Sequence, residues 1–98
     1  MEVKHEKRSG KGIFYIEENG ERIANLLYIF KNDTTFSIEH TLVNHGYEGK
    51  GLAKALLNAA IAFARENAYK IIPVCPYAKK VMEGVETYAD VLYTVENS

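Results

Sequence analysis

The hydrophobic pattern in the first half of the chain predicts three strands. Residues 13–17 are β-branched and aromatic, and residues 23–30 and 35–43 have a similar composition. Asn19-Gly20 is typical of a tight hairpin turn, and residues 31–34 form a second polar turn. Short turns between successive strands favour an antiparallel meander. Residues 1–11 are polar, and we expect them to form a frayed lead-in.

The second predicted strand is apolar on both faces. Side chains alternate along a strand, so Ile23, Leu27 and Ile29 should lie on one face. The opposite face should contain Ala24, Leu26, Tyr28 and Phe30. A strand of this kind needs cover on both sides, from helices, a ligand or another subunit.

The second half of the chain has a helical period and then a strand. Leu52, Leu56, Ala60 and Phe63 form the apolar ridge of a helix over residues 52–67. Residues 69–75 resemble a strand. Pro73 has no N–H to donate, so that part should be an edge or a splayed end.

A short helix should follow over residues 76–83, with Pro76 at its first position. Residues 85–98 are ambiguous, and within them residues 88–93 fit either a short strand or a helical turn. The resulting order, βββ-α-β-α, predicts an α/β (α+β) fold with a mixed sheet. One parallel pairing is expected, through a right-handed crossover.

Composition limits the class of protein. The length of 98 residues fits a single domain spanning residues 1–98. A net charge of −1 gives no basic field for nucleic acid or an anionic membrane. The single cysteine excludes an internal disulfide framework, and the charged N-terminus has no apolar signal region. We therefore expect a cytoplasmic protein, a monomer or weak dimer, with no metal site because its three histidines and one cysteine are scattered.

The most informative segment is a glycine-rich turn, residues 46–53, between the third strand and the long helix. A helix start leaves backbone N–H groups unpaired and carries partial positive charge, and glycines allow a bulky anion to approach. Glycines mark ordinary turns more often than phosphate sites, and neither the Rossmann nor the Walker pattern is present. On its own, the turn leaves both interpretations open.

The segment Gly46-Tyr47-Glu48-Gly49-Lys50-Gly51-Leu52-Ala53 resembles the acetyl-CoA motif of the GNAT acyltransferases, Gln/Arg-x-x-Gly-x-Gly/Ala. Gly49 and Gly51 match its glycines, and Gly46 replaces the Gln or Arg. His40-Thr41, the run Lys70 to Ala78 and the Tyr88-x-Asp90-Val91 tail are similar to the very short YjdJ-type N-acetyltransferases. The likeness covers residues 13–93 and implies a minimal GNAT-like fold with acetyl-CoA as cofactor.

The resemblance also implies roles for particular residues. The third strand splays from the fourth, and the pantetheine arm bonds free backbone groups of Thr41, Leu42 and Val43. Backbone amides hold the pyrophosphate, and they belong to Tyr47, Glu48, Gly49, Lys50, Gly51, Leu52 and Ala53. The side chains of Lys50 and Lys54 have two interpretations, as flexible charges that approach the phosphates or as ordinary solvated lysines. Tyr77 is expected close to the acetyl group, as an acid.

Cys75 has two interpretations. Free cysteine is among the most buried residue types, so it is expected as a small core residue. Alternatively it is a thiol at a helix start, where the helix dipole favours thiolate. In the related short domains the cysteine lies near the CoA thiol, which makes Cys75 a candidate nucleophile or a group packing on the CoA sulfur.

His40 is the candidate general base. Strand alternation puts it on the same apolar face as Phe36, Ile38 and Leu42, where a histidine is either a hydrogen-bonded core residue or a base. Glu39 should face the other way as a second candidate base. His5 and His45 resemble surface or loop residues.

The function expected from these residues is acetyl transfer from acetyl-CoA to an unidentified amine. The amine attacks the thioester directly with His40 or a water chain as base, or the acetyl group passes through Cys75. Two other classes compete: a non-catalytic acyl-CoA-binding module and a small interaction domain that binds no cofactor.

Overall fold

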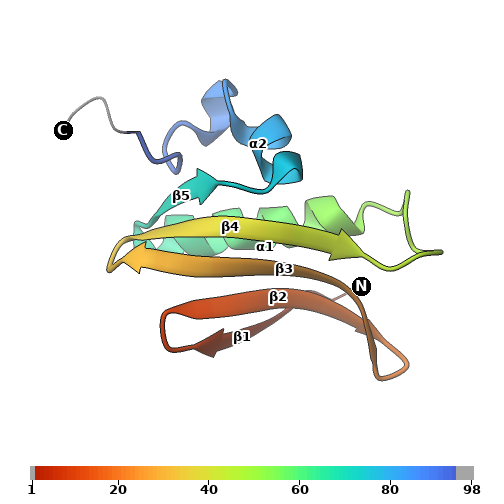
Figure 1. The fold of residues 1–98 in the computed structure, drawn as a ribbon. Coiled ribbons are helices and arrows are strands. Elements are labelled where there is room, and N and C mark those ends of the chain that lie inside the picture. Colours follow the sequence, from red (N-terminus) through yellow and green to blue (C-terminus); the bar gives the residue numbers. More distant parts are fainter. Residues whose placement is uncertain (1, 95–98) are drawn as a thin grey trace.

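The computed structural model describes residues 2–94 and contains one mixed sheet with two helices and a short 3-10 turn (Figure 1). The sheet order is β1-β2-β3-β4-β5; neighbours are antiparallel except β4 and β5, which are parallel. The elements are β1 Lys4–Arg8, β2 Lys11–Glu18, β3 Glu21–Asn32, β4 Thr35–Val43, α1 Leu52–Asn67, β5 Lys70–Pro73, α2 Pro76–Met82 and η1 Glu86–Tyr88.

Most of the predicted elements are confirmed, including the mixed sheet with one parallel pair. The long helix begins and ends at the predicted residues, because its apolar period and its glycine start are local signals. Asn19 and Gly20 both have positive φ, 55° and 82°, as the predicted hairpin turn requires. The ambiguous tail contains both alternatives, a turn at η1 and a parallel bridge from Leu92 to Ile71. Residues 95–98 of that tail lie outside the described residues.

The predicted lead-in at residues 1–11 is wrong, because Lys4–Arg8 form strand β1 at the edge of the sheet. The strand is polar, but His5 stacks on Phe14 with ring centroids 4.0 Å apart, and its Nε2 pairs with the Tyr28 hydroxyl at 2.6 Å. The Lys4 ammonium also lies 2.9 Å from Glu17 Oε1. These partners are distant in the sequence, so local composition did not reveal the strand.

The core lies between α1 and one face of the sheet. Aromatic rings from three strands meet the helix there: Phe14, Tyr28 and Phe36 all lie within 6 Å of the Phe63 ring centroid. The helix contributes a buried stripe, Leu52, Leu56, Leu57, Ala60, Ile61 and Ala64. Full burial of an aliphatic side chain stabilises the folded state by about 1.5–3 kcal/mol. Burial of this stripe is therefore the main interaction that holds α1 against the sheet.

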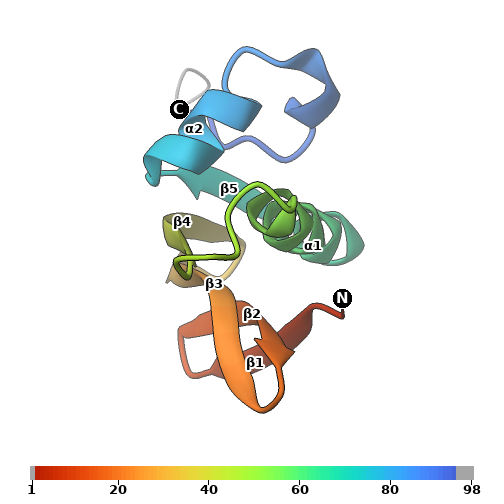
Figure 2. The same cartoon turned by 90° about the vertical axis from the view of Figure 1, so that its right-hand side faces the viewer.

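The other side of the sheet is the open face, formed by outward residues of β1 to β4 (Figure 2). The expected cover of β3 by a helix is present on one side of the sheet. α1 buries Ala24, Leu26 and Tyr28, whereas Leu27 and Ile29 stay half-exposed, and no helix among the described residues covers them. Ile23, predicted on the same face as Leu27 and Ile29, is instead fully buried, because it is the extra residue where the register with β2 shifts. The open face consists of Lys4, Glu6, Arg8, Lys11, Ile13, Tyr15, Asn25, Leu27, Ile29, His40 and Leu42.

α2 and the tail lie beyond β5, at the end of the sheet opposite β1 (Figures 1 and 2). The tail pairs with Ile71, whose N–H donates to the Val91 carbonyl and whose carbonyl accepts from Tyr93 N–H. Arg65 of α1 fixes the same segment by two hydrogen bonds to the Asp90 carboxylate, at 2.9 and 3.0 Å. The outer edge of β5 is thereby closed.

Candidate functional site

The glycine turn leaves free space at the start of α1. Gly46, Gly49 and Gly51 all have positive φ, between 79° and 93°, which favours glycine. Gly51 is the N-cap residue, and no side chain caps the helix. A Cβ built at any of the three glycines meets no atom within 4 Å. No side chain therefore accepts a hydrogen bond from the start of α1, the space around the glycines is open, and the residues present fit a phosphate group.

The turn is anchored to the β2–β3 hairpin. Asn44 N–H donates to the Ile23 carbonyl at 2.8 Å, and its side-chain amide donates to the Arg22 carbonyl. The Tyr47 hydroxyl bonds the Glu18 carboxylate, which raises the pKa of Tyr47. Neither Asn44 nor Glu18 was predicted as part of the site, because each contact joins the turn to a hairpin about 20 or more residues earlier in the chain.

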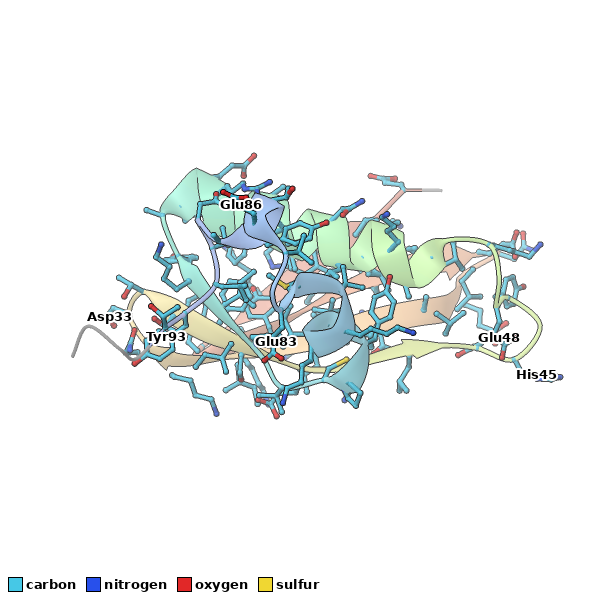
Figure 3. The ribbon with its side chains drawn as sticks, turned by 90° about the horizontal axis from the view of Figure 1, so that it is seen from above. Asp33, His45, Glu48, Glu83, Glu86 and Tyr93 are labelled. Carbon is cyan, nitrogen blue, oxygen red and sulfur yellow. The ribbon has the colours of Figure 1, made fainter. Side chains whose placement is uncertain are left out.

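Glu48 closes the turn on itself. Its Oε1 accepts a hydrogen bond from Gly46 N–H at 2.9 Å. Figure 3 shows Glu48 and His45 in this loop at one end of the molecule, far from Asp33 and Tyr93 at the opposite end. The predicted backbone donors thus belong to a loop that is ordered by its own side chains.

β4 and β5 separate halfway along β4. They pair only from Thr35 to Ile38, with Lys70 to Pro73, while β4 remains paired with β3 as far as Val43. The Ile38 carbonyl then accepts hydrogen bonds from both Val74 and Cys75 N–H, at 3.2 and 2.9 Å. Pro73 lies at the end of the pairing, where a missing N–H is tolerated. The second edge of Thr41–Val43 therefore has no strand partner among the described residues.

Cys75 lies where the two strands separate. Its side chain is buried, and its Sγ is 3.5 Å from the Thr41 hydroxyl across the gap. It is also the N-cap residue of α2, with Pro76 in the first turn. Both interpretations of the sequence are thus compatible with its position: it is buried, and it lies at a helix start beside Thr41.

A hollow of about 270 Å³ connects the glycine turn with α2. Gly49, Gly51 and Lys54 line one part of it, and Val43 and Tyr77 line another. Burial is the main cause that raises the pKa of Tyr77, with smaller contributions from Tyr88 and Cys75, so its hydroxyl stays protonated. The hollow therefore joins three groups of predicted cofactor residues, from the strand end, the turn and α2.

His40 does not lie on the predicted face. Ile38 pairs with Tyr28 toward α1, but the next pair is His40 with Leu27, on the open face. The extra residue is Glu39, at a bulge that reverses the alternation. The expectation of an apolar core environment for His40 is therefore wrong, and nothing in the local sequence indicated the bulge.

The neighbours of His40 follow from the same bulge. Leu42, predicted on the same face as His40, does share it and is 54% exposed. The Glu39 carboxylate accepts a hydrogen bond from the Ser37 hydroxyl and lies 3.9 Å from the Lys31 ammonium. Both candidate bases therefore lie at the point where β4 leaves β5.

Two further findings concern the described residues 2–94. No helix there is long and apolar enough to cross a membrane. Within the same range, no group of three or more His, Cys, Asp or Glu side chains is arranged to hold a metal ion.

This combination of a glycine-rich helix start and a parallel pair that splays defines a class of protein. Residues 13–91 match the family model of the GCN5-related N-acetyl-transferases, and the chain belongs to that family. Among curated proteins it is similar to Protein NATD1 of Danio rerio, with 33% identity over 85% of this chain and 74% of the relative. Protein NATD1 of Homo sapiens is 32% identical, with 73% of its length covered.

One solved structure supports the same family, and another shows the same fold. A GCN5-like protein from Staphylococcus aureus has a TM-score of 0.72 and 34% identity, over 97% of this chain and 90% of that one. A GNAT acetyltransferase from Elizabethkingia anophelis with acetyl-CoA bound has a TM-score of 0.58 and 20% identity, over 66% of this chain and 43% of that one. The second likeness concerns the fold alone.

Proposed function

We propose that this chain binds acetyl-CoA and transfers its acetyl group to a primary amine. The observation that carries the proposal is the coincidence of two features. The pairing of β4 with β5 ends at Ile38, and the uncapped start of α1 lines one hollow with Val43 and Tyr77. Membership of the GNAT family supports the same cofactor.

The pyrophosphate would be held by backbone N–H groups from Tyr47 to Ala53, with Lys54 as a nearby charge. The pantetheine arm would follow the free edge of Thr41–Val43, as an added strand does. When bound, acetyl-CoA supplies an activated acyl group. The protein's part is to orient that group between β4 and α2 and to handle protons.

Candidate proton donors and acceptors lie on both sides of the gap between β4 and α2. Tyr77 lines the hollow beside the proposed path of the arm, which is the position required of an acid for the departing thiol. His40 and Glu39 lie at the bulge and suit the role of base for an amine that approaches from the open face.

Cys75 opens a second route, because its thiol lies 3.5 Å from Thr41 on the predicted path of the arm. In that route the carbonyl carbon of the acetyl group would bond to Cys75 Sγ as its bond to the CoA sulfur breaks, and the Cys75 thiol proton would pass to CoA. An amine would then take the acetyl group from Sγ, and a proton of that amine would restore the Cys75 thiol. In the direct route Cys75 only packs against the arm.

Calorimetry with acetyl-CoA and a screen of amines, followed by CoA release, tests the proposal. Binding together with amine-dependent release is the expected result. Binding without release for any amine would favour the non-catalytic acyl-CoA module, and no binding would reject both. A burst of CoA without amine, lost in Cys75→Ala, would select the route through sulfur.

A further inference from the structure

The open face contains a shallow hollow of about 210 Å³ on β1, β2 and β3, away from the proposed cofactor site. Its apolar lining is Ile13 and Leu27, and its charged lining is Glu6, Arg8, Lys11 and Arg22. Three cations against one carboxylate leave a surplus of two positive charges here, although the whole chain has a net charge of −1.

The single carboxylate remains ionised. Glu6 accepts a hydrogen bond from Arg22 at 2.7 Å and one from Arg8 at 2.9 Å, and these bonds lower its pKa. Arg22 also stacks on Tyr15, with its guanidinium carbon 3.8 Å from the ring centroid. The Arg22 guanidinium is thereby held over the open face. Lys11 forms no ion pair with an acidic side chain among the described residues.

The hollow is connected to the candidate bases by the register of the sheet. Glu6 pairs with Ile13, Ile13 pairs with Leu27, and Leu27 pairs with His40. These residues form a row that crosses four strands on the open face. Because neighbouring strands are about 4.8 Å apart, the two ends of the row are separated by about 14 Å. At the His40 end the row is bordered by the exposed Leu42.

We infer that the open face binds a polypeptide acceptor whose reactive amine lies at the β4 bulge and whose acidic residues lie over Arg8, Lys11 and Arg22. The inference rests on the proposed function. An extended chain rises about 3.3 Å per residue, so a distance of about 14 Å corresponds to about four residues. The acceptor sequence therefore has acidic residues about four positions from the amine.

A polypeptide fits this face better than a small molecule. Pockets for small molecules usually measure about 300–1,000 Å³ and enclose most of the ligand. This hollow is smaller and shallow, and it continues along a half-exposed apolar row of Ile13 and Leu27. A surface of this kind can contact several side chains of an extended segment.

The test uses two short peptides with one lysine each. One peptide has glutamates about four residues from the lysine on both sides, and the other has glutamines there. CoA release is measured with saturating acetyl-CoA. We expect a lower KM for the glutamate peptide, a KM about threefold higher in Lys11→Glu, and about tenfold higher in Arg8→Glu/Lys11→Glu. Lys80→Glu, an exposed charge reversal on α2, is the matched control and should leave the KM unchanged.

Equal KM values for the two peptides would overturn the inference, as would faster acetylation of small free amines. Direct binding separates this failure from failure of the proposed function. If no peptide is acetylated, amide shifts of Gly12, Ile13 and Leu27 with the glutamate peptide alone would still support the binding face. The absence of those shifts would reject it.

Discussion

At the scale of single residues, the candidate site depends on backbone conformation as much as on side chains. Gly51 has a φ of 79°, and the space in front of it is open. Cys75 and Thr41 meet across the gap, although 34 positions separate them in the sequence. His40 owes its place to one extra residue in β4. The residue types were readable from the sequence, whereas the face that His40 occupies was not.

Replacement of Gly51 by valine should weaken acetyl-CoA binding severely. The side chain would fill the space required by the phosphate, and a β-branched residue is strained at positive φ by about 1–2 kcal/mol. We expect an affinity loss of about tenfold or more by calorimetry. Gly10→Val is the matched control, because Gly10 also has positive φ and open space but lies in the β1–β2 turn. Equal loss of affinity in both variants would refute a local role for Gly51.

The substitution His40→Gln tests whether His40 is the general base that takes a proton from the amine. If His40 takes the proton of the amine, turnover should fall about a hundredfold while the fold and the acetyl-CoA affinity are retained. His45→Gln is the control, since the His45 side chain is fully exposed and His45 precedes the glycine turn. Unchanged turnover in His40→Gln would transfer the role to Glu39, Cys75 or water.

At the scale of elements, β1 contributes more than its polar sequence indicates. It joins the aromatic cluster through His5, which contacts Phe14, Tyr28 and Phe63. Burial raises the pKa of Tyr28 to about 12, so its hydroxyl stays neutral. The helix α1 was predicted from its own period, but β1 and the β4 bulge depend on pairing across strands. Local periodicity carries no information about such pairing.

Gly12 of β2 should not tolerate a side chain. A Cβ at this position would lie 2.3 Å from the Tyr28 hydroxyl oxygen, within the packed core. Gly12→Ala should therefore lower the free energy of unfolding by about 1–3 kcal/mol, because the Tyr28 ring must move. Urea denaturation measures the loss. A wild-type midpoint in this variant would show that the ring has room to shift.

The contact of His5 with Tyr28 predicts a dependence of stability on pH. Burial lowers the pKa of His5 below its usual 6.5, with a smaller contribution from Lys7. The unfolded chain then binds the proton more readily, so the stabilisation is complete above pH 6.5 and falls as the pH drops below that value. Urea midpoints at neutral and mildly acidic pH should differ more in the wild type than in His5→Phe. The same difference in both proteins would contradict this role.

At the scale of the whole molecule, the sheet separates two proposed tasks. One end of β4, together with α1 and α2, forms the hollow proposed for acetyl-CoA, and the open face of β1 to β4 offers a surface for the acceptor. The family, the glycine turn and the order of elements from β2 onward could be predicted from the sequence. The open face could not, because it depends on β1 and on the register of four strands.

The central claim is that acetyl-CoA binds across the start of α1 and the free edge of β4. An NMR titration of the full chain with acetyl-CoA tests it most directly. Amides from Tyr47 to Ala53 and from Thr41 to Val43 should shift together and saturate at one affinity, while those of β1 should stay in place. If neither segment shifts, the claim is wrong.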